Sequence, residues 1–571
     1  MNKIISLCII TLFLTDCAHF LKRDPSTKYN KKGVNIPEEA GEYPEVSEKD
    51  VLRGKLSSFR SCYDVTYYNL SLELNIKNKS ITGNCQINAI TQNDFDTLQV
   101  DLFENMEILS IKKSEKDFSF YRKHNAVFIE MPDMKKDSLF EITIQYEGLP
   151  KESKNPPWDG GFVWDEDKNE TPFIGVACEG TGASLWWPNK DHLSDEPDSM
   201  LISLTVPNGL MAVANGNLLD VDEGSKETRY DWFVSYPIDN YNVTLNIGHY
   251  AHFSDAYYAE DGDTLALDYY VIDYNEARAK EHFEQTKTVL ACYEKYLDKY
   301  PFWEDGFAMV ETPYLGMEHQ SAIAYGNQYM RGYLGGMIPR DMDWDYIIVH
   351  ETGHEYFGNS IGCHDMAEMW IQESFTTYLE AVYVEYTMSY DDANRYLAKQ
   401  QLFIYNQEPI IGPKDVNWDH WKGSDHYFKG SWVLHTLRHA IGDDEKWWAI
   451  FKGFYREHSL SLVTTEDFLA YVNKATGKDW TAFFDQYLRY PQPPLLEYQL
   501  EEKGKNLKVR YRWVTDVEQF VMPVVVGNGE KEITILPNTS EWQEAVLFNS
   551  KASDFKVATD RFLIKTKRVR T

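Results

Sequence analysis

The chain has 571 residues, of which 43% are hydrophobic and 26% are charged, a composition typical of folded domains rather than of disordered chains. At roughly 100–200 residues per domain, this length predicts about three domains. Lysine and arginine number 57 and aspartate and glutamate number 89, so the formal net charge is −32. That charge excludes a general nucleic-acid binder, which needs a basic face, and disfavours adsorption to anionic lipid.

The first segment of the chain is predicted to direct export. A lysine precedes a mostly apolar run over residues 4–14, which is too short to span a bilayer but is typical of a signal peptide. Residues 14–17, Leu-Thr-Asp-Cys, resemble a bacterial lipobox, in which the cysteine is lipidated after cleavage. We therefore expect a signal peptide over residues 1–17, with Cys17 as the candidate lipidation site, and a tether over residues 18–50. The expected location is the periplasm or the cell surface, with an outer-membrane lipoprotein as one form of the latter.

The seven cysteines do not predict a disulfide framework. Two lie in or beside the N-terminal segment, and the five that follow are widely spaced and odd in number, which favours isolated buried thiols. A bridge between Cys62 and Cys85 is the alternative, because an exported protein folds in an oxidising compartment.

Residues 51–250 are predicted to form an all-β domain. Leu70, Leu72 and Leu74 alternate with polar residues, which is the pattern of a half-buried strand. Similar short runs, separated by turn residues, occur at 97–102, 126–130 and 140–146.

After this region the pattern changes to helical spacing. Helices are expected at 276–299, 345–357, 367–387, 393–402, 430–439, 444–457 and 466–476. Strand patterns return after Pro491, at 507–513, 520–526 and 532–536. The sequence thus predicts an α+β multidomain protein. Its domains are the N-terminal β domain of 51–250, an α-rich domain of 251–490 and a small C-terminal β domain of 491–571.

A motif inside the helix predicted over residues 345–357 has the spacing of a metal site. His350 and His354 are four residues apart, so on a helix they lie about 40° apart on one face and can share one ion. Glu351 follows His350 directly and lies beside the ion rather than on it. That position suits a general base acting on a metal-bound water.

A carboxylate in the next predicted helix supplies a third ligand. Glu373 follows His354 after eighteen intervening residues, in the apolar stretch 370–375, where an unpaired charge would be costly to bury. Two histidines and one carboxylate leave a fourth position open, as catalytic zinc requires. We therefore expect one Zn²⁺ ion held by His350, His354 and Glu373.

These motifs resemble those of a known family. Residues 349–359, Val-His-Glu-Thr-Gly-His-Glu-Tyr-Phe-Gly-Asn, and residues 370–373, Trp-Ile-Gln-Glu, are similar to the zinc motif of the gluzincin aminopeptidases, peptidase family M1. The resemblance implies a saddle-like N-terminal β domain, a thermolysin-like catalytic domain and a small C-terminal β-sandwich, in the order predicted above. Many members add a large C-terminal helical domain, and we expect this chain to be a shorter, exported bacterial member without it.

This family has an exopeptidase motif upstream of the zinc helix, typically Gly-Ala-Met-Glu-Asn. Residues 315–319 resemble it as Leu-Gly-Met-Glu-His, which implies that Glu318 binds the free α-amine of the substrate. Gly316 and Met317 would lie along the substrate backbone. The first, second and last residues of the segment differ from the usual ones.

Two further residues match the family by position. Residues 426–430, His-Tyr-Phe-Lys-Gly, resemble the family's Tyr-Glu-Lys-Gly segment, which implies that Tyr427 donates to the oxyanion of the tetrahedral intermediate. Residues 177–180, Ala-Cys-Glu-Gly, precede a Trp-Trp-Pro sequence, in the order of the family's second amine-binding segment, so Glu179 is the candidate there. Lys429 is interpreted as a solvated or ion-paired charge.

Together the resemblance and the motifs imply an aminopeptidase. A zinc-activated water would attack the scissile carbonyl, Glu351 would act as general base, and the carboxylates of Glu179 and Glu318 would hold the α-ammonium. The expected partners are peptides with a free N-terminus, together with a bacterial membrane if Cys17 carries a lipid anchor. Two alternatives stay open: a bifunctional aminopeptidase and epoxide hydrolase, and a non-catalytic surface lipoprotein that binds peptides.

Overall fold

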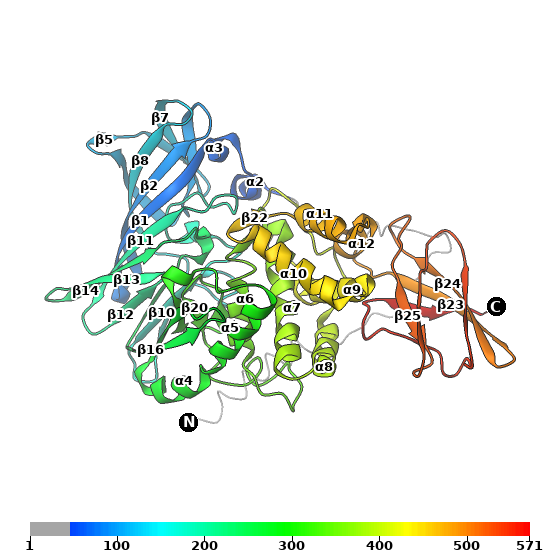
Figure 1. Cartoon of the computed structure of the whole chain (residues 1–571). Coiled ribbons are helices and arrows are strands. Elements are labelled where there is room, and N and C mark those ends of the chain that lie inside the picture. The colour runs from blue at the N-terminus through cyan, green and yellow to red at the C-terminus, as the bar shows by residue number, and fades with distance from the viewer. Residues whose placement is uncertain (1–45, 571) are drawn as a thin grey trace. The chain divides into compact units, whose positions relative to one another are not determined.

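The computed structural model describes residues 46–570, in which strands come first, helices follow and strands return (Figure 1). This order confirms the predicted α+β multidomain class. The signal peptide, Cys17 and nearly all of the tether lie outside the described residues, so what was predicted for them stays a prediction. The last residues of the tether differ from the expectation, because they enter helix α2 (Glu48–Gly54), whose start is fixed by a capping box between Ser47 and Asp50.

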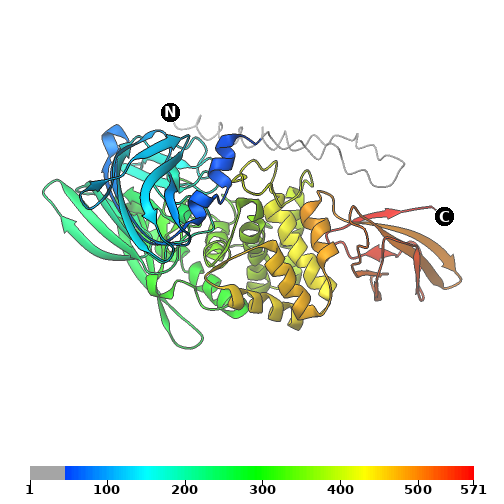
Figure 2. The ribbon, with the colours of Figure 1, turned by 90° about the horizontal axis from the view of Figure 1, so that it is seen from above.

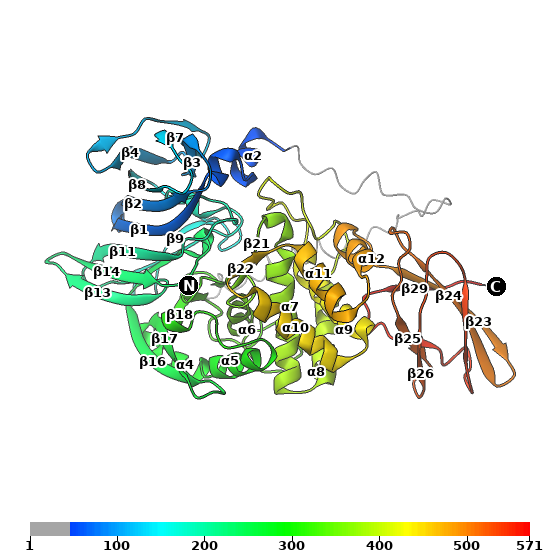
Figure 3. The same cartoon turned by 45° about the horizontal axis from the view of Figure 1, so that its top comes forward.

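The N-terminal part of the described chain is built from three sheets, and Figure 3 shows the strands of the largest side by side. The largest sheet contains, in spatial order, β13 (Asn217–Glu223), β14 (Glu227–Val234), β11 (Ser199–Pro207), β1 (Tyr63–Asn75), β2 (Ser80–Thr91), β8 (Leu139–Gly148), β4 (Met106–Lys113) and β5 (Lys116–Asp117). The second contains β12 (Met211–Ala214), β15 (Leu245–Gly248), β10 (Pro172–Ala177) and β9 (Gly161–Glu166). The third contains β3 (Phe95–Asp101), β7 (Ala126–Met134) and β6 (Phe120–Lys123).

The alternation of leucines and polar residues on β1 reflects the burial of one face of the strand. Leu70, Leu72 and Leu74 on β1 are buried, because successive side chains of a strand point to opposite faces and only one face reaches the core. The five cysteines of the described residues are buried and form no disulfide. The prediction of isolated thiols is therefore confirmed, and the alternative of a Cys62–Cys85 bridge is wrong.

A mixed sheet leads into the helical part of the chain. Its strands are, in spatial order, β16 (Tyr250–Tyr258), β17 (Thr264–Ile272), β18 (Phe307–Glu311), β20 (Ile323–Tyr325) and β19 (Gly316–Met317). β19 lies at one edge and pairs antiparallel with β20, while β18 runs parallel to both β17 and β20. This edge position leaves one side of β19 without a strand partner within residues 46–570.

The second half of the chain is rich in helices, and Figure 2 shows several of them side by side. They are α4 (Glu276–His282), α5 (Gln285–Tyr296), α6 (Tyr346–His354), α7 (Trp370–Thr387), α8 (Tyr390–Gln400), α9 (Asp425–Ile441), α10 (Asp444–His458) and α11 (Thr465–Thr476). Every residue of α7 from Trp370 to Val384 is buried, because α5, α6, α8 and α9 all pack against it. No helix within residues 46–570 is both long enough and apolar enough to cross a lipid bilayer.

The C-terminal strands form two small sheets in the described chain. One contains β27 (Gln543–Leu547), β24 (Asn506–Val514), β23 (Leu495–Lys503) and β29 (Lys565–Arg568). The other contains β26 (Glu532–Ile535), β25 (Val524–Gly527) and β28 (Lys556–Val557). The domain limits proposed from the sequence stay predictions.

Candidate metal centre and substrate site

Helix α6 presents both histidines of the motif. Its N-terminus is fixed by Asp345, whose Oδ1 accepts hydrogen bonds from the backbone N–H groups of Ile347 (2.8 Å) and Ile348 (3.3 Å). Gly353 lets the next helix come close, because a Cβ there would lie 3.0 Å from Cγ2 of Thr376 on α7. The short distance between these helices brings the first turn of α7 against the histidines.

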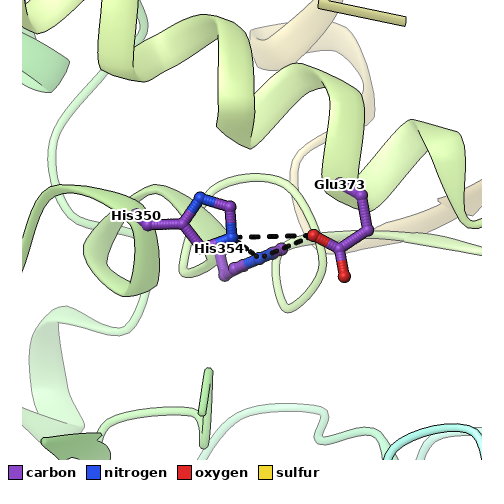
Figure 4. Close-up of side chains that lie close together, drawn as sticks. All are labelled: His350, His354 and Glu373. Carbon is purple, nitrogen blue, oxygen red and sulfur yellow. Dashed lines mark hydrogen bonds and ion pairs between the residues drawn. The ribbon is translucent and has the colours of Figure 1, made fainter. Parts of the chain in front are cut away.

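Three ligand atoms meet between the two helices (Figure 4). The Nε2 atoms of His350 and His354 are 3.1 Å apart, and Glu373 Oε2 is 3.6 Å and 3.3 Å from them respectively. Two atoms bound at 2.0–2.1 Å by a tetrahedral ion lie about 3.3–3.4 Å apart, so the spacing of this trio fits zinc.

The other ring nitrogens set the histidine tautomers. His350 Nδ1 donates to Glu380 Oε1 at 2.7 Å, and His354 Nδ1 donates to the carbonyl oxygen of Phe357 at 3.0 Å. With the protons held on Nδ1, each neutral ring directs the lone pair of Nε2 toward Glu373. Three electron-rich atoms facing one another in a buried place need a cation between them, which is the chemical requirement of a metal site.

The charges around this trio also favour a cation. Burial alone would raise the pKa of Glu373, but the nearby His354 and His350 hold it below its ordinary value. Burial alone would lower the pKa of His350, but Glu373 and Glu380 raise it well above its ordinary value. The carboxylates therefore favour positive charge at this point, and a divalent ion would supply it.

Glu380 is a functional residue that the sequence interpretation missed. It is fully buried, and besides His350 it accepts hydrogen bonds from the hydroxyl of Tyr396 and from Nε2 of Gln400 at 3.2 Å. A carboxylate seven residues after Glu373 lies on the same face of a helix, two turns along. This seven-residue spacing inside an apolar helix could have identified Glu380 from the sequence.

Glu351 lies against the strand that carries the exopeptidase motif. A Cβ on Gly316 would be 2.7 Å from Glu351 Oε1, so the carboxylate reaches the backbone of β19. Burial raises the pKa of Glu351 to about 7, although the neighbouring imidazoles of His350 and His354 oppose the rise. A carboxyl group with a pKa near neutrality can both take and return a proton.

Two further carboxylates, Glu318 and Glu179, follow strands that belong to different sheets. Glu318 directly follows β19, and its Oε1 accepts a hydrogen bond from the hydroxyl of Tyr241 at 3.2 Å. Glu179 follows β10, and its Oε1 is buried with no hydrogen-bond partner among the described residues. Burial, and then the charges of Glu318 and Glu373, raise the pKa of Glu179 well above its ordinary value. A positively charged group beside these two carboxylates would offset the repulsion between them.

The remaining predicted residues also lie near the site. Tyr427 stands in the first turn of α9, and its ring stacks on that of His350 with centroids 6.2 Å apart. Met317 is buried on β19, next to Gly316. The interpretation of Lys429 as a solvated charge is wrong, because it is fully buried and its Nζ donates to the carbonyl oxygens of Tyr490 and Pro491.

Two family models match this chain. The peptidase M1 N-terminal domain matches residues 65–238, and the peptidase family M1 domain matches residues 281–487. The second match contains the three ligand residues together with Glu318, Glu351 and Tyr427, and the first contains Glu179.

Curated relatives are distant but cover much of the chain. Aminopeptidase N of Lactococcus lactis subsp. lactis is 22% identical over 75% of this chain and 51% of its own length. Leucyl aminopeptidase of Saccharolobus solfataricus is 18% identical over 87% of this chain and 62% of its own length. The chain thus spans about half to three fifths of the length of these relatives.

Solved structures share the fold over nearly their whole length. An M1 zinc metallopeptidase from Deinococcus radiodurans has a TM-score of 0.64 at 18% identity, covering 75% of this chain and 94% of its own. A mutant of that enzyme bound to Tyr-Ser-Ala has the same TM-score at 17% identity, covering 78% and 96%. With both family models matched in order, the chain belongs to peptidase family M1.

Proposed function

We propose that this protein is a zinc-dependent aminopeptidase that removes the N-terminal residue from peptides. The observation that carries the proposal is the pairing of a three-ligand metal site with two nearby carboxylates, the buried Glu318 and Glu179, whose Oε1 is buried and unpaired among the described residues. An α-ammonium group would satisfy both carboxylates, whereas a peptide that continued past this point would leave them unpaired at a cost.

Each residue has a distinct task in this proposal. His350, His354 and Glu373 would hold the zinc ion, which when bound acts as a Lewis acid and lowers the pKa of water. Glu351 takes a proton from the attacking water and returns it to the leaving amine.

Two further contacts hold the substrate in place. The hydroxyl of Tyr427 donates to the oxygen of the scissile carbonyl as negative charge develops there. Glu179 and Glu318 fix the α-ammonium, so the cleaved bond follows the first residue.

The relatives support peptide substrates. Those reported above are described as aminopeptidases, and the Deinococcus enzyme has been solved with a bound tripeptide. They lend no support to the two alternatives, epoxide hydrolysis and non-catalytic binding. A protein that only bound peptides would have no need of a carboxylate at Glu351.

The test is hydrolysis of a panel of aminoacyl amides, with N-acetylated versions as controls. We expect release of the amino acid from the free-amine substrates only, loss of activity with a chelator and recovery with zinc. Glu351→Gln should lower kcat by about 10²–10⁴-fold while one zinc ion per chain is retained. If no amide in the panel is cleaved in a chelator-sensitive way, the proposal is wrong.

The amine-binding assignment is tested in the same assay. Glu318→Ala should reduce kcat/KM strongly and leave the zinc content unchanged, because Glu318 is not one of the three predicted ligands. Glu227→Ala, at an exposed glutamate on β14, is the control. Equal losses of zinc and activity in Glu318→Ala would refute this role.

A further inference from the structure

A cavity of about 320 Å³ lies beside the strand that carries the exopeptidase motif. Its volume falls within the range of small-ligand sites. Residues of β10, of the mixed sheet and of the loops beside that sheet line it, among them Phe173, Glu311, Tyr314, Leu315, Gln328 and Leu334. None of them is among the proposed catalytic or amine-binding residues.

The chain order places this cavity downstream of the bond that would be cleaved. Glu318 marks the substrate's amine, and Gly316, two residues earlier, lies next to Glu351. Leu315 and Tyr314, the next residues in the same direction, line the cavity. At about 3.3 Å per residue, the cavity begins one to two residues beyond the catalytic carboxylate.

The opposite wall gives the same order. Glu179 follows the C-terminal end of β10 and lies near Glu318, which adds to the rise in its pKa. Farther back on the same strand, the carbonyl oxygen of Val176 accepts a hydrogen bond from the hydroxyl of Tyr314 at 3.0 Å. Phe173, near the N-terminal end of β10, lines the cavity. On both segments, therefore, the residues that line the cavity lie earlier in the chain than the glutamate of the amine site.

The edge strand allows a substrate to follow these walls. β19 pairs with β20 on one side, and its other side has no strand partner within residues 46–570. An extended peptide can add to such an edge, and its side chains then project into pockets along it. The cavity lies beside this edge, at Leu315.

The lining indicates which side chain the cavity accepts. Phe173, Leu315 and Leu334 supply apolar surface. The one carboxylate, Glu311, already accepts hydrogen bonds from Ile272 N–H (2.8 Å), from Asn275 Nδ2 (2.7 Å) and from the hydroxyl of Tyr329 (2.9 Å). Because its oxygens are occupied, Glu311 does not require a cationic guest.

We infer that this cavity binds a bulky apolar or aromatic side chain of one of the two substrate residues that follow the cleaved bond. The inference rests on the proposed aminopeptidase function and adds a selectivity on the leaving side of the bond. Burying an aromatic side chain there favours such peptides by about tenfold or more in kcat/KM.

The experiment compares three peptides with one N-terminal residue: Leu-Gly-Gly, Leu-Phe-Gly and Leu-Gly-Phe. We expect at least one phenylalanine peptide to exceed Leu-Gly-Gly by about tenfold in kcat/KM. Leu334→Asn should reduce that ratio toward one, and Phe173→Ala on the other wall should act in the same direction. Ratios are used because they cancel any loss of folded enzyme.

Leu460→Asn is the matched control. Leu334 and Leu460 are both leucines with 39% exposure and a positive φ, of 47° and 56°, a conformation that asparagine tolerates well. Leu460→Asn should leave the ratio as in the wild type. Equal rates for the three peptides, or a ratio unchanged in both cavity variants, would overturn the inference. Failure of the proposed function would instead appear as no cleavage of any of them.

Discussion

At the scale of single residues, the site depends on a contact between two helices. Glu380 on α7 holds the Nδ1 proton of His350 on α6 and so leaves Nε2 free for the ion. Groups that orient a metal ligand in this way typically change metal affinity by 10- to 100-fold when they are removed.

We therefore expect Glu380→Gln to weaken zinc binding by about 10- to 100-fold, because the charge that favours this tautomer is lost. The measurement is competition for zinc against a chelator of known affinity. Glu385→Gln is the control, since Glu385 lies on the same helix but pairs with Arg438. Unchanged zinc affinity in Glu380→Gln would show that Glu380 does not orient His350.

The ligand residues could be predicted from the sequence because their spacing is a local property of two helices. His350, Glu351 and His354 share one helix, and Glu373 opens the next. Contacts between elements could not be predicted in the same way. The hydrogen bond from Tyr241 to Glu318 joins residues 77 positions apart, and no periodicity indicates such a pair.

At the scale of helices, the N-terminus of α6 is expected to contribute strongly to the stability of the fold. Asp345 accepts the two capping bonds described above, and its Oδ2 accepts a bond from the hydroxyl of Tyr325 at 2.7 Å and contacts His282 Nε2 at 2.7 Å. One buried carboxylate thus joins the zinc helix to β20 and to α4.

Asp345→Ala should lower the free energy of unfolding by about 2–4 kcal/mol, because it removes a cap and leaves a buried hydroxyl without an acceptor. Asp345→Asn, which retains a capping oxygen, should cost less. Ser389→Ala, at the N-cap of α8, is the control and should cost about 1 kcal/mol. Urea denaturation of the three variants checks the order, and equal costs for Asp345→Ala and Ser389→Ala would contradict it.

The existence of the helices was predictable, but their boundaries were less so: the helix expected over 430–439 is α9, which begins five residues earlier, at Asp425. The helix expected over 276–299 is two helices, α4 and α5, separated at Phe283. No glycine or proline marks the break. Phe283 is buried and stacks on Tyr269 of β17 with ring centroids 5.1 Å apart, so tertiary packing rather than local sequence ends α4 there.

At the scale of the whole molecule, the net charge of −32 bears on how substrates arrive. A strongly acidic protein attracts cationic peptides over distances comparable to the Debye length, and salt screens that attraction. The local carboxylates at the amine site add to the same field.

We expect kcat/KM for a peptide with added downstream lysines to fall as the salt concentration rises, while kcat stays constant. For a peptide with added glutamates it should rise or stay level, because salt then screens a repulsion. Steady-state kinetics from low to high sodium chloride test this. If both peptides respond alike, the charge does not guide association.

The close approach of Gly316 to Glu351 has an evolutionary consequence. The exopeptidase motif typical of the family has alanine where this chain has Gly316, yet here the added methyl carbon would lie 2.7 Å from a carboxylate oxygen and 2.9 Å from Cγ2 of Ile347. Restoring the common residue would therefore push the base away from its present position. The residue that position 316 can accept therefore depends on where the side chains of Glu351 and Ile347 lie.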